Sequence, residues 1–305
     1  MSAGEIRAQG TQAAMDAAIE RIRGLAIWRG AVDPQPLGGG ITNSNFVVAD
    51  GARKYVVRLG ADIPLHNVMR FNERAAALAA EAAGISPALR HFEPGLIVID
   101  FIEGRTFTEA DVRAHLPRVV ELVKRAHVEV TRHLRGPALG FWTFHILRNY
   151  LAALTERRHR LAADFPRLAA LAERLEATLG PTEIVFGHND LLPGNFIDDG
   201  RRLWLIDWDY GGFNTPLFDL GNLASNNELD RPQRETLLQL YYGREPDDAL
   251  RLRFQSMVVA SLLRESLWSM ISELESSIDF DYATYTASNL SRFDRALTDF
   301  EALAR

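Results

Sequence analysis

A short β-patterned segment, residues 183–207, interrupts a chain that is otherwise mostly helical in pattern beyond Gly104. Two apolar runs frame it: one ends at Gly187, and the other extends from Leu203 to Ile206. The residues between the runs include proline, glycine and several polar types, which is the composition of a loop. The pattern predicts a mainly helical lobe that carries one polar loop between two short strands.

The first hundred residues are richer in strands than the rest of the chain. In the whole chain, the expected elements are a first helix ending near Gly24, strands at 46–48, 55–57 and 96–99, and helices at 71–83, 117–133, 143–162, 165–179, 231–242, 246–272 and 282–304. This order predicts an α+β protein of two lobes. The smaller, β-rich lobe is expected over residues 1–102, and the larger, mainly helical lobe over residues 103–305.

The polar loop holds three residues whose types and spacing suit phosphoryl transfer. His188, Asp190 and Asn195 follow the spacing His-x-Asp-x-x-x-x-Asn of a kinase catalytic loop, and Asp207 ends the next strand. The reaction requires a carboxylate to take the proton of the attacking hydroxyl and oxygen ligands for Mg²⁺. Asp and Asn also cap turns, but the full spacing between two apolar strands favours the catalytic interpretation. For His188 we expect a structural role.

A glycine-rich stretch opens the first predicted strand. Its glycine, hydroxyl and amide residues can bind phosphate oxygens, although a hairpin turn is the commoner explanation of such a stretch. The candidate nucleotide-binding residues in it are Gly39, Gly40, Thr42, Asn43 and Ser44. On the next strand, Arg58 is a candidate partner for ATP phosphates, and Glu73 of the following helix is its candidate anchor. The alternative for Arg58 is an exposed arginine on an edge strand.

Three stretches of the chain resemble a known group of enzymes: GHNDLLPGN, LIDWDYGG and PLFDLGN. They are similar to the aminoglycoside phosphotransferase and choline kinase superfamily, and within it to bacterial choline/ethanolamine kinases. The similarity extends from about Leu37 to the C-terminus. It implies a bilobal protein-kinase-like fold, ATP and Mg²⁺ as cofactors, and a small amino alcohol as substrate.

The resemblance also implies roles for individual residues. Asp190 is the implied base, in contact with the acceptor hydroxyl, and Asn195 and Asp207 are the implied Mg²⁺ ligands. The backbone of Asp100 to Ile102 is the implied adenine-binding connector. Asp219 is the implied brace of the catalytic loop.

The C-terminal segment bears on the substrate. A quaternary ammonium makes no hydrogen bonds, so aromatic faces and carboxylates must replace its water. By resemblance, Tyr210, Trp268 and Tyr285 stand at the positions of an aromatic cage. Glu265 stands where choline kinases often have a further tryptophan, which suits a primary ammonium or another amino alcohol. Core packing is the alternative role of the aromatic residues.

Other activities stay open at this point. A protein kinase is disfavoured because the few residues between Asp207 and Pro216 leave no room for a long activation segment. A kinase of aminoglycosides, thiamine or another metabolite alcohol is the nearest alternative. For a polycationic aminoglycoside, the candidate acidic residues are Glu265, Glu273, Glu275 and Asp279. An inactive nucleotide-binding scaffold is less consistent with the intact catalytic set.

Composition limits the partners. The chain has 305 residues, a net charge of -6 and no cysteine. The charge argues against nucleic-acid and anionic-membrane partners, and the missing cysteines exclude disulfides and suit a reducing cytosol. No apolar run approaches the ~20 residues of a membrane span. We therefore expect a cytoplasmic monomer or homodimer.

Overall fold

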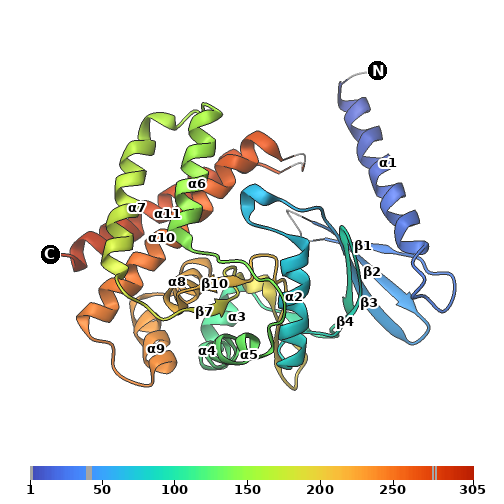
Figure 1. The fold of residues 1–305 in the computed structure, drawn as a ribbon, viewed down its shortest axis with the longest axis horizontal. Helices are drawn as coiled ribbons and strands as arrows, with labels where there is room; N and C mark the ends of the chain where they lie inside the picture. Colours follow the sequence, from blue (N-terminus) through green and yellow to red (C-terminus); the bar gives the residue numbers. More distant parts are fainter. Residues whose placement is uncertain (1–2, 39–42, 277, 279) are drawn as a thin grey trace. The chain divides into compact units, whose positions relative to one another are not determined.

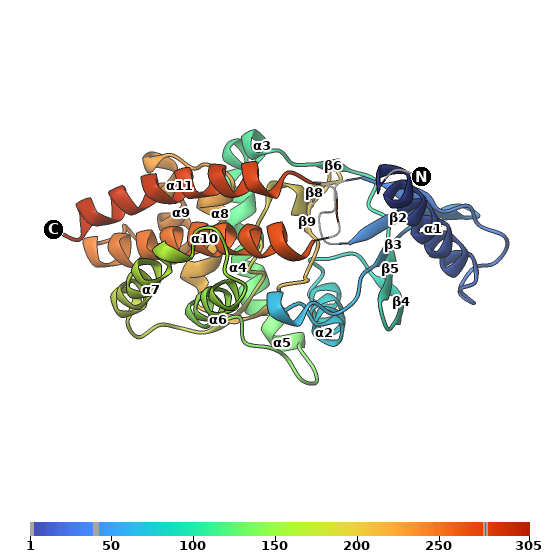
Figure 2. The same cartoon turned by 90° about the horizontal axis from the view of Figure 1, so that it is seen from above.

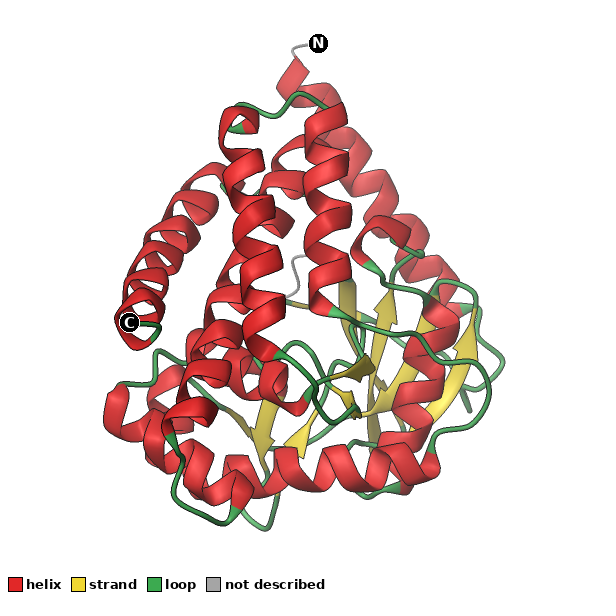
Figure 3. Cartoon of the chain, turned by 60° about the vertical axis from the view of Figure 1, so that its left-hand side comes forward, coloured by secondary structure: helices red, strands yellow, loops and turns green. Residues whose placement is uncertain are grey.

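The computed structural model describes residues 3–38, 43–276, 278 and 280–305. The chain forms two compact units. The first contains residues Met1–Asp62 and Pro87–Glu103, and the second contains Ile63–Ser86 and Gly104–Arg305. The α+β prediction is confirmed: a small antiparallel sheet lies in the first unit, and helices dominate the second (Figure 3).

The first unit is built on a five-stranded antiparallel sheet in the order β1-β2-β3-β5-β4. Its strands are β1 (Gln35–Leu37), β2 (Ser44–Asp50), β3 (Arg53–Leu59), β4 (Leu89–Glu93) and β5 (Leu96–Asp100). The predicted hairpin is β2–β3, and Gly51 of its turn has a φ of +62°, a conformation that glycine adopts without strain. The short strands β1 and β4 were not predicted.

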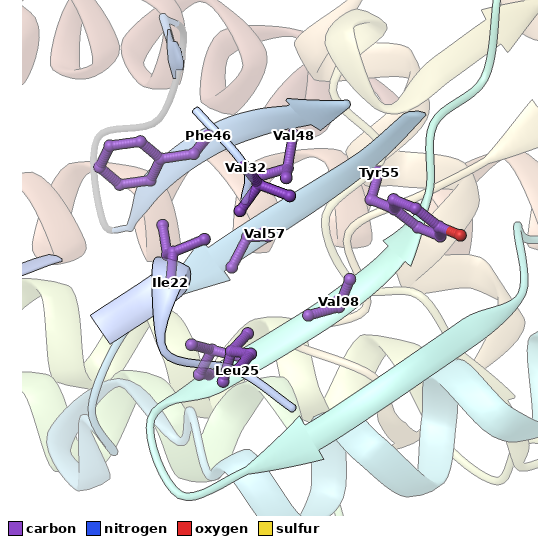
Figure 4. Close-up of a cluster of buried hydrophobic side chains, with 9 residues drawn as sticks. Ile22, Leu25, Val32, Phe46, Val48, Tyr55, Val57 and Val98 are labelled. Atoms are coloured by element: carbon purple, nitrogen blue, oxygen red, sulfur yellow. The ribbon is translucent and has the colours of Figure 1, made fainter. Parts of the chain in front are cut away.

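The core of this unit lies where helix α1 (Ala3–Arg23) ends against the sheet (Figure 4). Ile22 and Leu25 pack against inward-facing residues of three strands. On β2 and β3 these residues alternate with more exposed ones, as the pleat requires. These residues include Phe46, Val57 and Val98, all 0% exposed.

Helix α2 (Arg70–Ala82) belongs to the second unit, whereas the sequence placed it within a first lobe of residues 1–102. Its buried face explains the difference. The side chain of Asn72 donates to the carbonyl of Gly211 at 2.7 Å and accepts from the amide of Leu139 at 2.9 Å. These bonds satisfy polar groups that would otherwise be buried without partners.

The second unit is mainly helical (Figures 1 and 2). Its longest helices, α10 (Asp248–Glu275) and α11 (Tyr282–Leu303), pack against each other along much of their length. The other helices are α3 (Glu109–Ala114), α4 (Leu116–Arg125), α5 (Thr131–His133), α6 (Thr143–Glu156), α7 (Phe165–Leu179), α8 (Pro216–Asn226) and α9 (Arg231–Tyr242). A π-helical turn, Ala126–Val130, joins α4 to α5, so the predicted helix 117–133 is nearly continuous.

Helix α8 was not predicted. It begins as helices commonly do, with Thr215 as N-cap and Pro216 at the first position. Gly221 obscures the pattern because glycine disfavours helix interiors. Here the glycine serves packing: a Cβ at Gly221 would lie 2.7 Å from the backbone of Met257 in α10.

Five short strands complete the second unit. Strand β7 (Val185–Gly187) pairs with β10 (Gly212–Asn214), and β8 (Phe196–Asp198) lies between β6 (Arg105–Thr106) and β9 (Leu203–Leu205). The predicted polar loop connects β7 to β8. Among the described helices, none is both long and apolar enough to cross a membrane.

Candidate active site

Strand pairing brings the predicted metal ligands together. Strands β8 and β9 are antiparallel, with Phe196 opposite Leu205. One step beyond that pair, the amide of Ile206 donates to the carbonyl of Asn195 at 3.0 Å. Asp207, the next residue, therefore lies beside the end of the loop that connects β7 to β8. We call this loop, which carries His188, Asp190 and Asn195, the predicted catalytic loop. Its φ of +69° is rare for a residue with a Cβ and is the kind of backbone strain found at functional sites.

The catalytic loop is braced by Asp219 of α8. Its carboxylate accepts from the backbone amides of His188 at 2.8 Å and Asn189 at 2.7 Å. Gly187 permits this approach, since a Cβ there would lie 3.0 Å from Oδ2 of Asp219. The implied brace thus makes the contacts that such a role requires.

Asp219 has a third partner, His127, which the sequence did not single out. Nε2 of His127 lies 2.8 Å from Oδ2 of Asp219, and both side chains are buried. Burial would raise the pKa of Asp219, but the hydrogen bond and the charge of His127 outweigh it and hold that pKa below its ordinary value. The brace is therefore an ionised carboxylate.

His188 has the expected structural role. It is 1% exposed, and its Nε2 bonds the carbonyl of Ile206 at 2.9 Å. Burial lowers the pKa of His188, which favours the neutral ring. The adjacent Asn189 has a φ of +64°, and its side chain donates to the carbonyls of Tyr210 and Gly212. These bonds tie the start of the catalytic loop to the chain after Asp207.

Asp190, the predicted base, is 14% exposed at its side chain. Burial is the main cause that raises its pKa to about 8. The positive charge of Arg264, whose Nη1 lies 3.9 Å from Oδ1 of Asp190, opposes this shift. The negative charges of Glu265, Asp207 and Asp209 add to it. Desolvation and like-charge repulsion therefore outweigh the single ion pair.

Asn195 and Asp207 suit a hard cation. The amide nitrogen of Asn195 donates to the carbonyl of Asp190 at 2.8 Å, which leaves its side-chain oxygen as the acceptor for a ligand. Amide and carboxylate oxygens are ligands that Mg²⁺ prefers. The mutual repulsion among Asp190, Asp207 and Asp209 is also what a cation would relieve. The residues therefore fit Mg²⁺.

The residues expected to bind nucleotide lie mostly in the first unit. Gly39, Gly40 and Thr42 are outside the described residues. Asn43 and Ser44 lie at the start of β2, and Arg58 lies on β3 opposite Asn45.

Glu73, the expected anchor of Arg58, lies in the second unit. It is buried on α2 and accepts from Nη1 of Arg70 at 2.5 Å. The same nitrogen lies 3.2 Å from Asp209, so Arg70 links α2 to the segment after Asp207. The pairing of Glu73 with Arg58 stays a prediction.

The expected adenine connector, Asp100 to Ile102, begins at the last residue of β5. The amides of Asp100 and Phe101 donate to the carbonyls of Ala88 and Lys54. Among the described residues, the amide of Ile102 has no such partner, so it is the backbone donor available to a ligand.

Three of the predicted substrate residues, Glu265, Trp268 and Tyr285, lie on α10 and α11, and we call this group the α10–α11 wall. The hydroxyl of Tyr285 donates to Oε1 of Glu265 at 2.7 Å, and the rings of Trp268 and Tyr285 meet edge to face with centroids 6.5 Å apart. Trp268 is 4% exposed, and within the described chain its buried Nε1 has no hydrogen-bond partner. The structure thus brings Glu265, Trp268 and Tyr285 together.

Tyr210 lies near this wall, but another cation covers its ring. The Cζ atom of Arg264 is 4.4 Å from the ring centroid, and the ring of Phe141 meets it edge to face at 5.8 Å. Arg264 also forms the ion pair with Glu265, with Nη1 2.7 Å from Oε2. Sequence reasoning missed Arg264 because an arginine within an apolar helix has no spacing signal that distinguishes it from a surface residue.

Comparisons with known proteins identify the family of the chain. Residues 33–253 match the model of the phosphotransferase enzyme family. Human ethanolamine kinase 2 is 30% identical over 241 residues, which cover 70% of this chain and 61% of that protein. The chain thus spans less than two thirds of the length of this relative.

Two solved structures share the fold. A choline/ethanolamine kinase family protein from Mesorhizobium loti has 26% identity and a TM-score of 0.76, with 95% of this chain and 97% of that chain covered. LicA in complex with AMP has 21% identity and a TM-score of 0.75, with 94% and 98% covered. With the family model matching most of its length, this chain belongs to the phosphotransferase enzyme family.

Proposed function

We propose that this protein is a kinase that transfers the γ-phosphoryl group of ATP to the hydroxyl of a small amino alcohol, choline or ethanolamine. The observation that carries the proposal is the placement of Asp190. Its loop is braced by Asp219, and its carbonyl accepts from the candidate ligand Asn195. The negative charges of Asp207 and Glu265 act on its carboxylate.

Asp190 acts as the base in this proposal. One of its carboxylate oxygens accepts the hydroxyl proton as the acceptor oxygen forms its bond to the γ-phosphorus. The bond from that phosphorus to the bridging oxygen breaks, and ADP leaves. A pKa near 8 suits the role, because general bases work best when their pKa lies close to the working pH.

Asn195 and Asp207 would hold Mg²⁺. When bound, the ion would neutralise the negative charge of the phosphates. The hydrogen bond from Asn195 to the carbonyl of Asp190 sets the direction of the amide oxygen, and the bond between Ile206 and Asn195 keeps Asp207 beside it. Both ligands are thus held before any ion binds.

The first unit would bind the nucleotide. Its candidates for the phosphates are the glycine-rich stretch with Asn43 and Ser44, and Arg58, whose guanidinium suits phosphate geometry. The amide of Ile102 is the candidate donor to adenine. Family membership supports ATP as the phosphoryl donor, and LicA, which shares the fold, has been solved with AMP.

Glu265, Trp268 and Tyr285 would bind the amino group of the acceptor. A carboxylate and aromatic rings are groups that attract an ammonium ion. Of the other acidic candidates, Glu273 pairs with Arg160 and Glu275 pairs with Arg157, and Asp279 lies outside the described residues. A polycationic aminoglycoside would need several carboxylates in one place, and of the described candidates Glu265 is the one beside the rings of Trp268 and Tyr285, which favours an acceptor with one amino group.

The test is ATP consumption and product identification with choline, ethanolamine, methylated ethanolamines, thiamine and aminoglycosides as acceptors. We expect turnover with an amino alcohol and a loss of at least about 100-fold in kcat for Asp190→Asn. Asp248→Asn, at a fully exposed carboxylate, is the matched control and should keep wild-type turnover. Turnover only with thiamine or aminoglycosides would contradict the proposed substrate class, and near wild-type turnover in Asp190→Asn would contradict the assigned base.

A further inference from the structure

Arg264 is a fully buried cation in the middle of the longest helix. It lies on α10, is 2% exposed, and is among the largest side chains that the protein buries. An arginine is almost never buried to this extent unless its charge is compensated. The groups that surround Arg264 therefore indicate its role.

The compensation is partial. Nη1 pairs with Oε2 of Glu265 at 2.7 Å and lies 3.9 Å from Oδ1 of Asp190. Within the described part of the chain, the buried Nε and Nη2 atoms have no hydrogen-bond partner. Buried N–H groups without acceptors are costly. Ordinary core packing therefore does not account for this arginine.

The guanidinium also occupies a face of the Tyr210 ring that could otherwise hold a cationic ligand. It lies over the Tyr210 ring at 4.4 Å, within the ~6 Å of a cation–π contact. Phe141 covers a further part of the same ring. Arg264 and Phe141 thus occupy part of the aromatic surface of Tyr210.

We propose that Arg264 is a specificity-determining residue that excludes quaternary ammonium groups and selects acceptors with a primary ammonium. The inference rests on the proposed amino alcohol kinase activity. In this inference, Arg264 occupies the face of the Tyr210 ring that an N-methylated head group would otherwise occupy. Glu265 is then the group that binds the substrate nitrogen.

The reason is the difference between the two head groups. A trimethylammonium group has no N–H and depends on ring faces and charge alone. Beside Tyr210 it would meet a second positive charge and two N–H groups that also need acceptors. A primary ammonium can donate hydrogen bonds to Glu265 and Tyr285 without using the Tyr210 ring.

The experiment compares kcat/KM for ethanolamine and choline in the wild type, Arg264→Met and Arg264→Lys. We expect the wild type to prefer ethanolamine by about 10-fold or more, and Arg264→Met to raise the choline-to-ethanolamine ratio by about 10-fold. Methionine has a long, flexible apolar side chain that fills the space without charge. Arg264→Lys keeps the charge and should keep the preference.

A second measurement needs only the wild type, in case Arg264→Met does not fold. Methylammonium should compete with ethanolamine, whereas tetramethylammonium should not compete at the same concentration. Choline preference in the wild type, competition by tetramethylammonium, or an unchanged ratio in folded Arg264→Met would each overturn the inference. Those results leave the proposed kinase activity intact, whereas no turnover with any amino alcohol would overturn both.

Discussion

The predicted catalytic loop, which carries Asp190, and the α10–α11 wall differ in how their polar groups are satisfied. In the loop, the backbone amides of His188 and Asn189 bond Asp219, and the amide of Leu191 bonds Asn222. In the wall, Nε and Nη2 of Arg264 and Nε1 of Trp268 are buried and have no acceptor within the described chain.

The difference separates two tasks. Polar groups that the protein satisfies itself are held in place before any ligand arrives, which is what a base and metal ligands require. Buried donors without acceptors mark the surface where a ligand or water completes the contacts. Changes in the loop should therefore affect stability and turnover, whereas changes in the wall should affect the choice of acceptor.

The largest effect is expected for Asp219→Ala. The substitution leaves two backbone amides and His127 without their buried acceptor. We expect a loss of about 3–5 kcal/mol in the free energy of unfolding, measured by urea denaturation. Asp248→Ala, at a fully exposed carboxylate, should stay within about 0.5 kcal/mol of wild type. A loss below 1 kcal/mol in Asp219→Ala would mean that the loop does not depend on this brace.

A smaller effect of opposite sign is expected for Asp190→Asn. Burial raises the pKa of Asp190 to about 8 in the folded protein, against an ordinary value of 3.8. Between these pH values the folded state keeps a proton that the unfolded state releases, so wild-type stability falls as pH rises toward 8. Asparagine removes this loss, which the two pKa values put at about 5 kcal/mol at pH 8. Its buried amide N–H groups give back about 3 kcal/mol, so the variant should become more stable than wild type by about 2 kcal/mol.

The measurement is urea denaturation of both proteins from pH 5 to pH 8 without divalent metal. The stability gain of Asp190→Asn should increase with pH across this range. A gain that is constant with pH would show that the carboxyl is not protonated in the folded protein. Such a result would contradict the difference between the loop and the wall, because the charge of Asp190 would then be compensated as well as the polar groups of the loop around it.

The smallest effect is expected for Tyr285→Phe in the wall. It removes one hydroxyl, which donates to Glu265 at 2.7 Å, and keeps the ring beside Trp268. We expect about a fivefold rise in KM for the amino alcohol, with KM for ATP unchanged. Tyr282→Phe is the matched control, since that hydroxyl bonds Ser276 at 2.9 Å. Equal changes in both KM values would contradict a role for Tyr285 confined to the acceptor.

Much of the fold was predictable because its signals are local. The predicted helices at 165–179 and 231–242 have the observed bounds. Proline at an early position and apolar spacing on one face are visible in sequence. Helix α8 escaped prediction because Gly221 weakens its pattern, and only the close approach of α10 explains that glycine.

The sequence by itself determined the likeness of residues 188–207 to a kinase loop. The reason is that Asn195 and Asp207 flank the paired strands β8 and β9 and Asp190 lies in the loop just before them, so their spacing already encodes their proximity. Tertiary structure alone decided what surrounds Asp190, the proposed base. Arg264 reaches Asp190 only through the packing of α10, and its charge is stable there only because Glu265 and the Tyr210 ring compensate it.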